Sequence, residues 1–123
     1  MNLSPPTPDK SPQAAEELRE LTRTVCEKFP DDYWRERDLH REYPHEFVDA
    51  LTKKKLLAAL IPLEYGGLGV GVTEAGEILE EINRSGGHAA ALHGQLYTMS
   101  AMLRHGTREQ KDKYLPMLAS GEI

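Results

Sequence analysis

The sequence is poor in cysteine, and none of its apolar stretches is long enough to span a membrane. Cys26 is the only cysteine, so the chain can form neither an internal disulfide nor a CxxC site. The helical pattern around Cys26 predicts a packed, unreactive thiol. The most apolar stretch, within residues 88–105, is shorter than the ~20 apolar residues of a transmembrane helix and contains His93, Gly94 and Gln95. We therefore expect no association with a membrane.

Positive charge is outnumbered by negative charge. The chain has 15 Lys and Arg residues against 20 Asp and Glu, a net charge of −5 and a pI near 5.5. A surface that binds nucleic acid must be basic in order to neutralise phosphates, so we expect no nucleic-acid partner. The first ten residues contain no apolar run, and Lys10 is the only base before Arg19. A secretory signal needs an apolar run, and a mitochondrial transit peptide needs several basic residues. Neither is present in the first residues, so we expect a cytoplasmic location.

Length and composition predict one domain preceded by a short leader. At 123 residues, 39% of them hydrophobic, the chain falls within the usual single-domain range. Residues 1–11 include Pro5, Pro6 and Pro8, a composition typical of a flexible leader. Residues 12–123 are predicted to form the domain.

Apolar residues recur at helical spacing through most of this domain, which predicts an all-α, five-helix bundle without a convincing strand. The first helix is expected to have Ser11 as N-cap, and the third to begin with Thr73 as N-cap. Residues 31–43 are predicted to be a loop with at most a turn or two of helix and with their aromatic side chains folded inward. The apolar run 56–61 fits either a buried strand or the end of the second helix.

The fourth predicted helix, residues 88–105, differs from the others. Arg104 is its only formally charged residue, and small or apolar residues occupy nearly all its sides. A helix that is apolar all round must be enclosed by other helices or by lipid, so this segment is predicted to be the most buried element. Gly106 ends it, and Thr107 with Gln110 forms a capping box for the fifth helix.

No catalytic, metal-binding or cofactor-binding residue is predicted. The glycine-rich stretch 66–71 fits no GxGxxG register and lacks a P-loop lysine, so its glycines are expected to form tight turns. His45 has no histidine partner four residues later, because that position is Asp49. His88 and His93 are separated by about 140° around a helix and do not face one metal easily.

His93 is the polar residue that stands out, because it lies midway along the most apolar helix and next to Gly94. Two interpretations are open. His93 is a core histidine bonded to a neighbouring carbonyl, with Gly94 permitting close helix contact, or this side of the helix borders a ligand cavity.

Two motifs carry a resemblance to a known family. The stretch IPLEYGGLG, residues 61–69, followed by GTREQKDKYLPMLASGE, residues 106–122, closely resembles the N-terminal helical domain of the acyl-CoA dehydrogenase flavoenzymes. The resemblance covers residues 12–122. Lys55 departs from it, because the family usually has glycine there to form a left-handed helix end; a lysine in that conformation costs about 1 kcal/mol.

The resemblance implies a function for the complete enzyme: α,β-dehydrogenation of an acyl-CoA thioester, with hydride transfer to FAD. The usual catalytic base and the main flavin contacts belong to a middle β-domain and a C-terminal helical domain, both absent from these 123 residues. By alignment back from Gly106, Ala90, His93 and Tyr97 occupy positions that border the substrate's acyl tail. The remaining domains of the same enzyme are the expected partners.

We expect the chain alone to be inactive, to hold no FAD, and to self-associate through surfaces that those domains would cover. Two alternatives stay open. One is a free-standing helical interaction module or truncated paralogue with no catalytic role. The other is a flavin oxidase or monooxygenase with the same fold.

Overall fold

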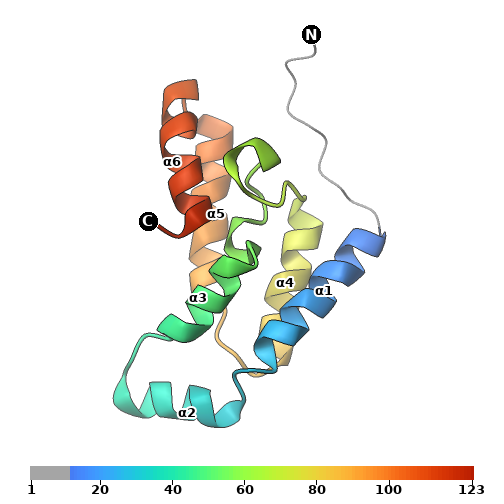
Figure 1. The fold of residues 1–123 in the computed structure, drawn as a ribbon, viewed down its shortest axis with the longest axis vertical. Coiled ribbons are helices and arrows are strands. Elements are labelled where there is room, and N and C mark those ends of the chain that lie inside the picture. Colours follow the sequence, from blue (N-terminus) through green and yellow to red (C-terminus); the bar gives the residue numbers. More distant parts are fainter. Residues whose placement is uncertain (1–11) are drawn as a thin grey trace.

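The computed structural model describes residues 12–123, and these form an all-helical fold without a β-strand (Figure 1). The elements are α1 (Pro12–Cys26), α2 (Asp31–His40), α3 (His45–Lys53), η1 (Leu56–Ala58), η2 (Leu63–Tyr65), α4 (Val72–Arg84), α5 (Ala90–His105) and α6 (Arg108–Ser120), of which η1 and η2 are short 3₁₀ helices. The all-α prediction is confirmed, but the count of five helices is wrong. The predicted leader, residues 1–11, and the Ser11 N-cap lie outside the described residues.

The additional helix is α2, which falls in the stretch predicted to be a loop. Pro30 precedes it, and Asp31 and Asp32 occupy its first turn, where carboxylates interact favourably with the helix dipole. None of its residues is buried, so it shows no periodic apolar stripe in the sequence. The inward folding of Tyr33 and Trp34 is confirmed, because both pack against the core.

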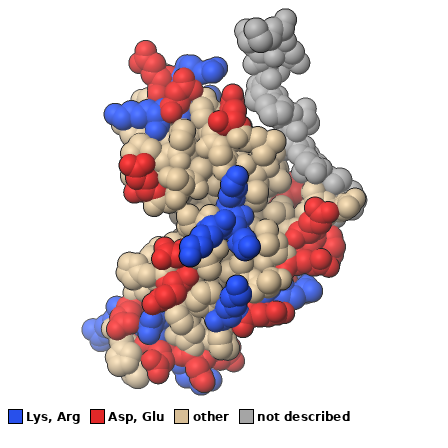
Figure 2. Space-filling view, viewed as in Figure 1, with Lys and Arg blue, Asp and Glu red and all other residues tan. Residues whose placement is uncertain are grey.

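Helices α1 and α4 lie side by side and run in the same direction (Figure 1). Two ion pairs fix their register: Arg19 Nη2 lies 2.6 Å from Glu77 Oε2, and Arg23 Nε lies 3.0 Å from Glu81 Oε1. Both pairs span 58 residues of sequence, which is the pattern of a parallel helix pair. Elsewhere on the face shown in Figure 2, acidic and basic side chains are interspersed.

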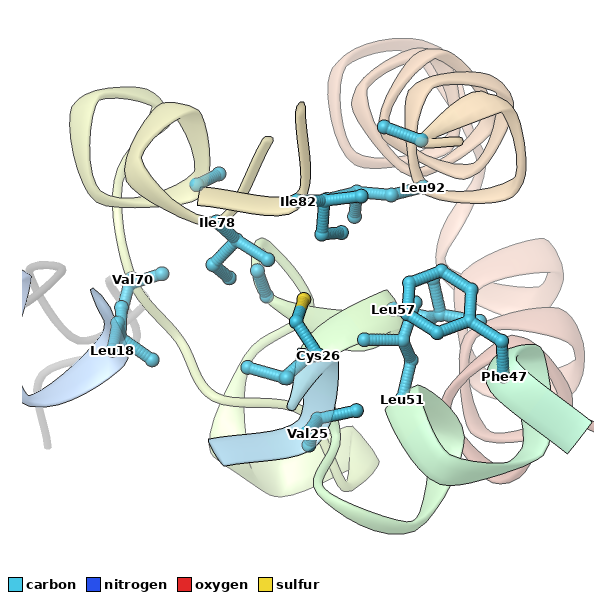
Figure 3. Packing of buried hydrophobic residues seen from close by; sticks show 14 residues of the cluster. Leu18, Val25, Cys26, Phe47, Leu51, Leu57, Val70, Ile78, Ile82 and Leu92 are labelled. Atoms are coloured by element: carbon cyan, nitrogen blue, oxygen red, sulfur yellow. The ribbon is translucent and has the colours of Figure 1, made fainter. Parts of the chain in front are cut away.

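The main core lies between these two helices, α3, η1 and the start of α5. In Figure 3, Cys26 of α1 lies beside Ile78 and Ile82 of α4, with Phe47 of α3 and Leu92 of α5 closing the other side. A second cluster joins η1 to the α5–α6 pair, and its buried members are Ala58, Ile61, Met99, Leu115, Leu118 and Ala119. The interface between α5 and α6 is therefore anchored to the connection between α3 and α4.

That connection, residues 54–71, forms neither the strand nor the helix end that the sequence allowed. Leu56, Leu57 and Ala58 form η1, and all three are buried. Lys55 precedes η1 with φ 61° and ψ 16°, so the left-handed conformation implied by the resemblance is confirmed.

The helix ends agree with the sequence only in part. Thr107 and Gln110 form both hydrogen bonds of the predicted capping box at the start of α6. The predicted N-cap Thr73 is wrong, because α4 already begins at Val72 and Gly71 occupies the N-cap position.

Candidate functional site

The candidate site is the side of α5 that carries Ala90, His93, Gly94 and Tyr97, hereafter the outer face of α5. All four residues are exposed, and the Tyr97 side chain is 69% exposed. The spacing of three and four residues places them along one side of the helix. This exposure corrects the prediction that residues 88–105 are the most buried element: within α5 only Leu92 and Met99 are buried. An apolar sequence predicts that a helix face is buried, but it does not show whether residues 12–123 or another molecule bury it.

The two large side chains on this face touch each other. The rings of His93 and Tyr97 meet edge to face, with centroids 4.9 Å apart. His93 is therefore not a core histidine. A Cβ atom added at Gly94 would meet no atom within 4 Å, so in the described part of the chain this glycine does not serve a close helix contact. Of the two interpretations of His93, the core histidine is wrong, and the position beside a ligand cavity stays a prediction.

The opposite side of α5 is fixed firmly to the bundle. Leu92 and Met99 are fully buried, and the Gln95 side-chain amide donates a hydrogen bond of 3.3 Å to the carbonyl oxygen of Leu118 in α6. Anchoring along the inner side fixes the position of α5 and so leaves its outer face free of contacts with the bundle.

The lower end of the outer face opens into a recess beside α2. Ala90 and Ala91 of α5 line it together with Trp34 of α2 and Gly87 of the α4–α5 loop. The sequence does not predict this recess, because the pattern of residues 31–43 indicates a loop where the structure has α2. The inward-folded Trp34 was the one signal that pointed toward it.

The glycine-rich stretch is not a phosphate cradle, because its amide groups are already bonded. The N–H groups of Leu68, Gly69 and Val70 donate to the carbonyl oxygens of Ala58, Ile61 and Ala59 at 2.9–3.1 Å. A phosphate-binding loop needs such amides free. The prediction that these glycines form tight turns is confirmed by Gly66 and Gly69, both of which have positive φ angles.

Cys26 is the only thiol in the chain, and it is buried. Burial raises the pKa of the Cys26 thiol, which agrees with the predicted unreactive packing. Across residues 12–123, no three His, Cys, Asp or Glu side chains come together to hold a metal ion. Over the same range, no helix combines the length and the apolar character needed to cross a membrane.

Comparison with known proteins identifies the family. Residues 12–122 match the family described as acyl-CoA dehydrogenase, N-terminal domain. The mitochondrial isovaleryl-CoA dehydrogenase of Pongo abelii is 34% identical over 125 residues, which cover 95% of this chain and 29% of that protein. The corresponding enzyme of Solanum tuberosum is 44% identical over 69 residues, or 54% of this chain and 17% of that protein. The chain thus spans less than a third of the length of these relatives.

A structural comparison agrees. A chain from work on the electron transferring flavoprotein of Acidaminococcus fermentans and flavin-based electron bifurcation superposes with a TM-score of 0.70. The match covers 98% of this chain and 31% of the other at 24% sequence identity, a level that supports the fold alone. Together with the family match over nearly the whole domain, it leads to one conclusion: the chain belongs to the acyl-CoA dehydrogenase family, as its N-terminal helical domain.

Proposed function

We propose that these residues serve as the N-terminal domain of an FAD-dependent acyl-CoA dehydrogenase, and that the outer face of α5 forms one wall of the pocket for the acyl chain. The observation that carries the proposal is the character of this face. It is exposed, it contains no Asp, Glu, Lys or Arg among Ala90, His93, Gly94 and Tyr97, and the helix is held from behind. Exposed faces of helices are normally charged, so an uncharged one is suited to contact an apolar chain or another domain.

The face suits an acyl tail better than reacting atoms. Ala90 leaves space, while the rings of His93 and Tyr97, in edge-to-face contact, present a bulkier aromatic surface. Pocket shape of this kind discriminates substrates by size, at roughly 1–3 kcal/mol per misfit methylene group. We propose no role for His93 or Tyr97 in proton or hydride transfer.

The described residues do not fit a flavin by themselves. The glycine-rich amides that would hold its phosphates are bonded within the chain, and no arginine or lysine lies among the four residues of the outer face. We therefore assign the flavin, the catalytic base and the rest of the acyl pocket to further domains of the enzyme. This assignment implies that residues 1–123 alone neither retain FAD nor oxidise acyl-CoA. The cytoplasmic location stays a prediction.

The test compares the complete protein encoded by the gene with the 123-residue chain. We expect the complete protein to be yellow, to retain FAD through gel filtration, and to reduce an artificial electron acceptor when acyl-CoA is added. The chain alone should be colourless and inactive. Hydrogen peroxide formed in step with substrate would indicate an oxidase instead. A complete protein without flavin or turnover would contradict the proposal and support a helical interaction module.

A further inference from the structure

Helix α2 differs from the other α-helices in how it is attached to the bundle. None of its ten residues is buried, whereas each of the other five α-helices among residues 12–123 contributes buried residues to the core. Figure 1 shows α2 lying across the end of the bundle, and the recess of about 730 Å³ separates it from the start of α5. Because an element with little buried apolar surface opens at a low free energy, α2 is the helix most easily separated from this domain.

One side chain makes most of the packing contacts of α2 with the bundle. The Trp34 indole N–H donates a 3.1 Å hydrogen bond to the carbonyl oxygen of Phe29, and its ring packs edge to face on Phe47, with centroids 4.8 Å apart. A Cβ atom at Gly87 would lie 3.0 Å from Cζ2 of Trp34, so the indole lies directly against the α4–α5 loop. Trp34 is therefore the main contact that keeps α2 docked.

The other contacts of α2 are polar and lie near the solvent. The Tyr33 hydroxyl donates a 2.9 Å hydrogen bond to Glu46 Oε2. The Arg37 guanidinium lies 3.4 Å from Glu42 and 3.6 Å from Glu46, whose side chains are 53% and 63% exposed, and ion pairs this exposed contribute little stability. Within residues 12–123, the buried Nε of Arg37 has no hydrogen-bond acceptor, which disfavours the docked position. These groups orient α2 but do not hold it strongly.

The ends of α2 also favour its release. Pro30 precedes the helix, and Arg41 ends it with φ 54° and ψ 43°, a left-handed conformation that is unfavourable for a residue with a side chain. Release of α2 relieves this strain. Isolated helices shorter than ~12–15 residues are marginal in water, so α2 does not persist as a helix once it leaves the bundle. Detachment and unwinding are therefore a single event.

We propose that residues 31–43 form a flap that detaches and unwinds as one unit while the other α-helices stay folded. Trp34 is the contact that keeps the flap closed. Opening widens the recess beside the start of α5 and uncovers the ring of Phe47, which is 1% exposed in the closed arrangement. The inference is independent of the proposed function, because it rests on the packing of α2 alone.

Amide hydrogen exchange tests the flap on the complete protein encoded by the gene, with mass spectrometry of peptides from each helix. We expect the amides of residues 31–43 to exchange together and faster than those of α4. Their exchange should also depend less on added urea, because opening the flap exposes less surface than unfolding the domain.

Two variants separate opening of the flap from unfolding of the domain. Ile78 of α4 is buried beside Cys26 (Figure 3), and Ile78→Val should speed exchange in α4 by about 2–10-fold. Exchange in residues 31–43 should not change, because Ile78 stays packed when the flap opens. Trp34→Phe should speed exchange in residues 31–43 by about tenfold through the lost hydrogen bond and ring contacts.

Leu39→Ala is the matched control for Trp34→Phe. Leu39 lies on the outer side of α2 and is 76% exposed, so its truncation should change exchange in residues 31–43 by less than about twofold. Exchange of these residues at the rate of α4, or an equal response of both segments to Ile78→Val, would overturn the inference, because α2 would then open only with the whole domain. Equal effects of Trp34→Phe and Leu39→Ala would overturn the role of Trp34.

Discussion

The rings of His93 and Tyr97 pack edge to face at 4.9 Å on a side of α5 that no other described element covers. The two rings contact each other and remain exposed, so they are available to contact another molecule. We expect the same face to make the isolated chain associate with itself, because contiguous exposed apolar surface usually finds a partner.

Self-association should therefore depend on Tyr97. We expect Tyr97→Asp to weaken association of the 123-residue chain by about tenfold, because a charge is then placed on the contact surface. Sedimentation velocity over a concentration series measures the effect. Leu39→Asp is the control, since Leu39 is 76% exposed on α2 and lies outside the outer face of α5. A wild-type chain that stays monomeric at high concentration, or equal effects of the two variants, would refute this prediction.

Lys55 stores conformational strain that glycine would relieve. Its φ angle of 61° is left-handed, and Lys55→Gly should stabilise the fold by about 0.5–1 kcal/mol. Urea unfolding provides the measurement. Lys54→Gly is the neighbouring control: Lys54 has φ −91°, so glycine there should bring no gain. A stabilisation that is the same at both positions would show that charge, and not backbone strain, is responsible.

Gly67 is required because the backbone passes too close for a side chain. A Cβ atom there would lie 2.1 Å from the carbonyl oxygen of Ile61, so Gly67→Ala should cost at least ~2 kcal/mol through forced displacement. Gly76 lies within α4 with nothing within 4 Å of an added Cβ, and Gly76→Ala should instead stabilise by about 0.5–1 kcal/mol. Thermal unfolding of the two variants should shift in opposite directions; a small loss for Gly67→Ala would contradict the packing described here.

Several local features could be predicted from the sequence because their causes are local. The α6 capping box needs only Thr107 and Gln110 at the right spacing. The left-handed Lys55 followed from the resemblance, since the family's glycine marks a backbone conformation that the chain keeps despite the substitution.

Other features could not be predicted, because their causes lie elsewhere in the fold. Helix α2 has no buried residue and so leaves no apolar period in the sequence; what holds it is the contact of Tyr33 and Trp34 with distant core residues. The exposure of the outer face of α5 was missed because sequence shows that a helix is apolar, but not which molecule covers it. The recess beside Ala90 could not be predicted either, because it is formed by α2 and by the exposed start of α5.

Alkaline pH should weaken the contact between η2 and α6. The Tyr65 hydroxyl donates a 2.6 Å hydrogen bond to Asp112 Oδ1, and this bond, with burial and the nearby carboxylate, raises the pKa of Tyr65. Because folding raises the pKa of Tyr65, the protonated hydroxyl stabilises the folded state. This contribution is complete at pH values below the pKa in the unfolded chain, about 10. It is lost as the pH rises through the higher pKa in the folded chain. Tyr65→Phe should cost about 1 kcal/mol at neutral pH. The difference from wild type should shrink above pH ~10 in urea unfolding measurements, and a constant difference would contradict the assignment.

The most direct test of the central claim is a series of kcat/KM values for acyl-CoA substrates of increasing chain length, measured on the complete protein with and without His93→Trp. If the outer face of α5 borders the acyl tail, the larger ring should shift preference toward shorter or unbranched acyl groups, with losses of about 10–200-fold for the longest chains. Proton abstraction should change little, so the shortest substrates should keep their rates. Two parallel profiles that differ only by a constant factor would contradict the claim and place His93 outside the acyl pocket.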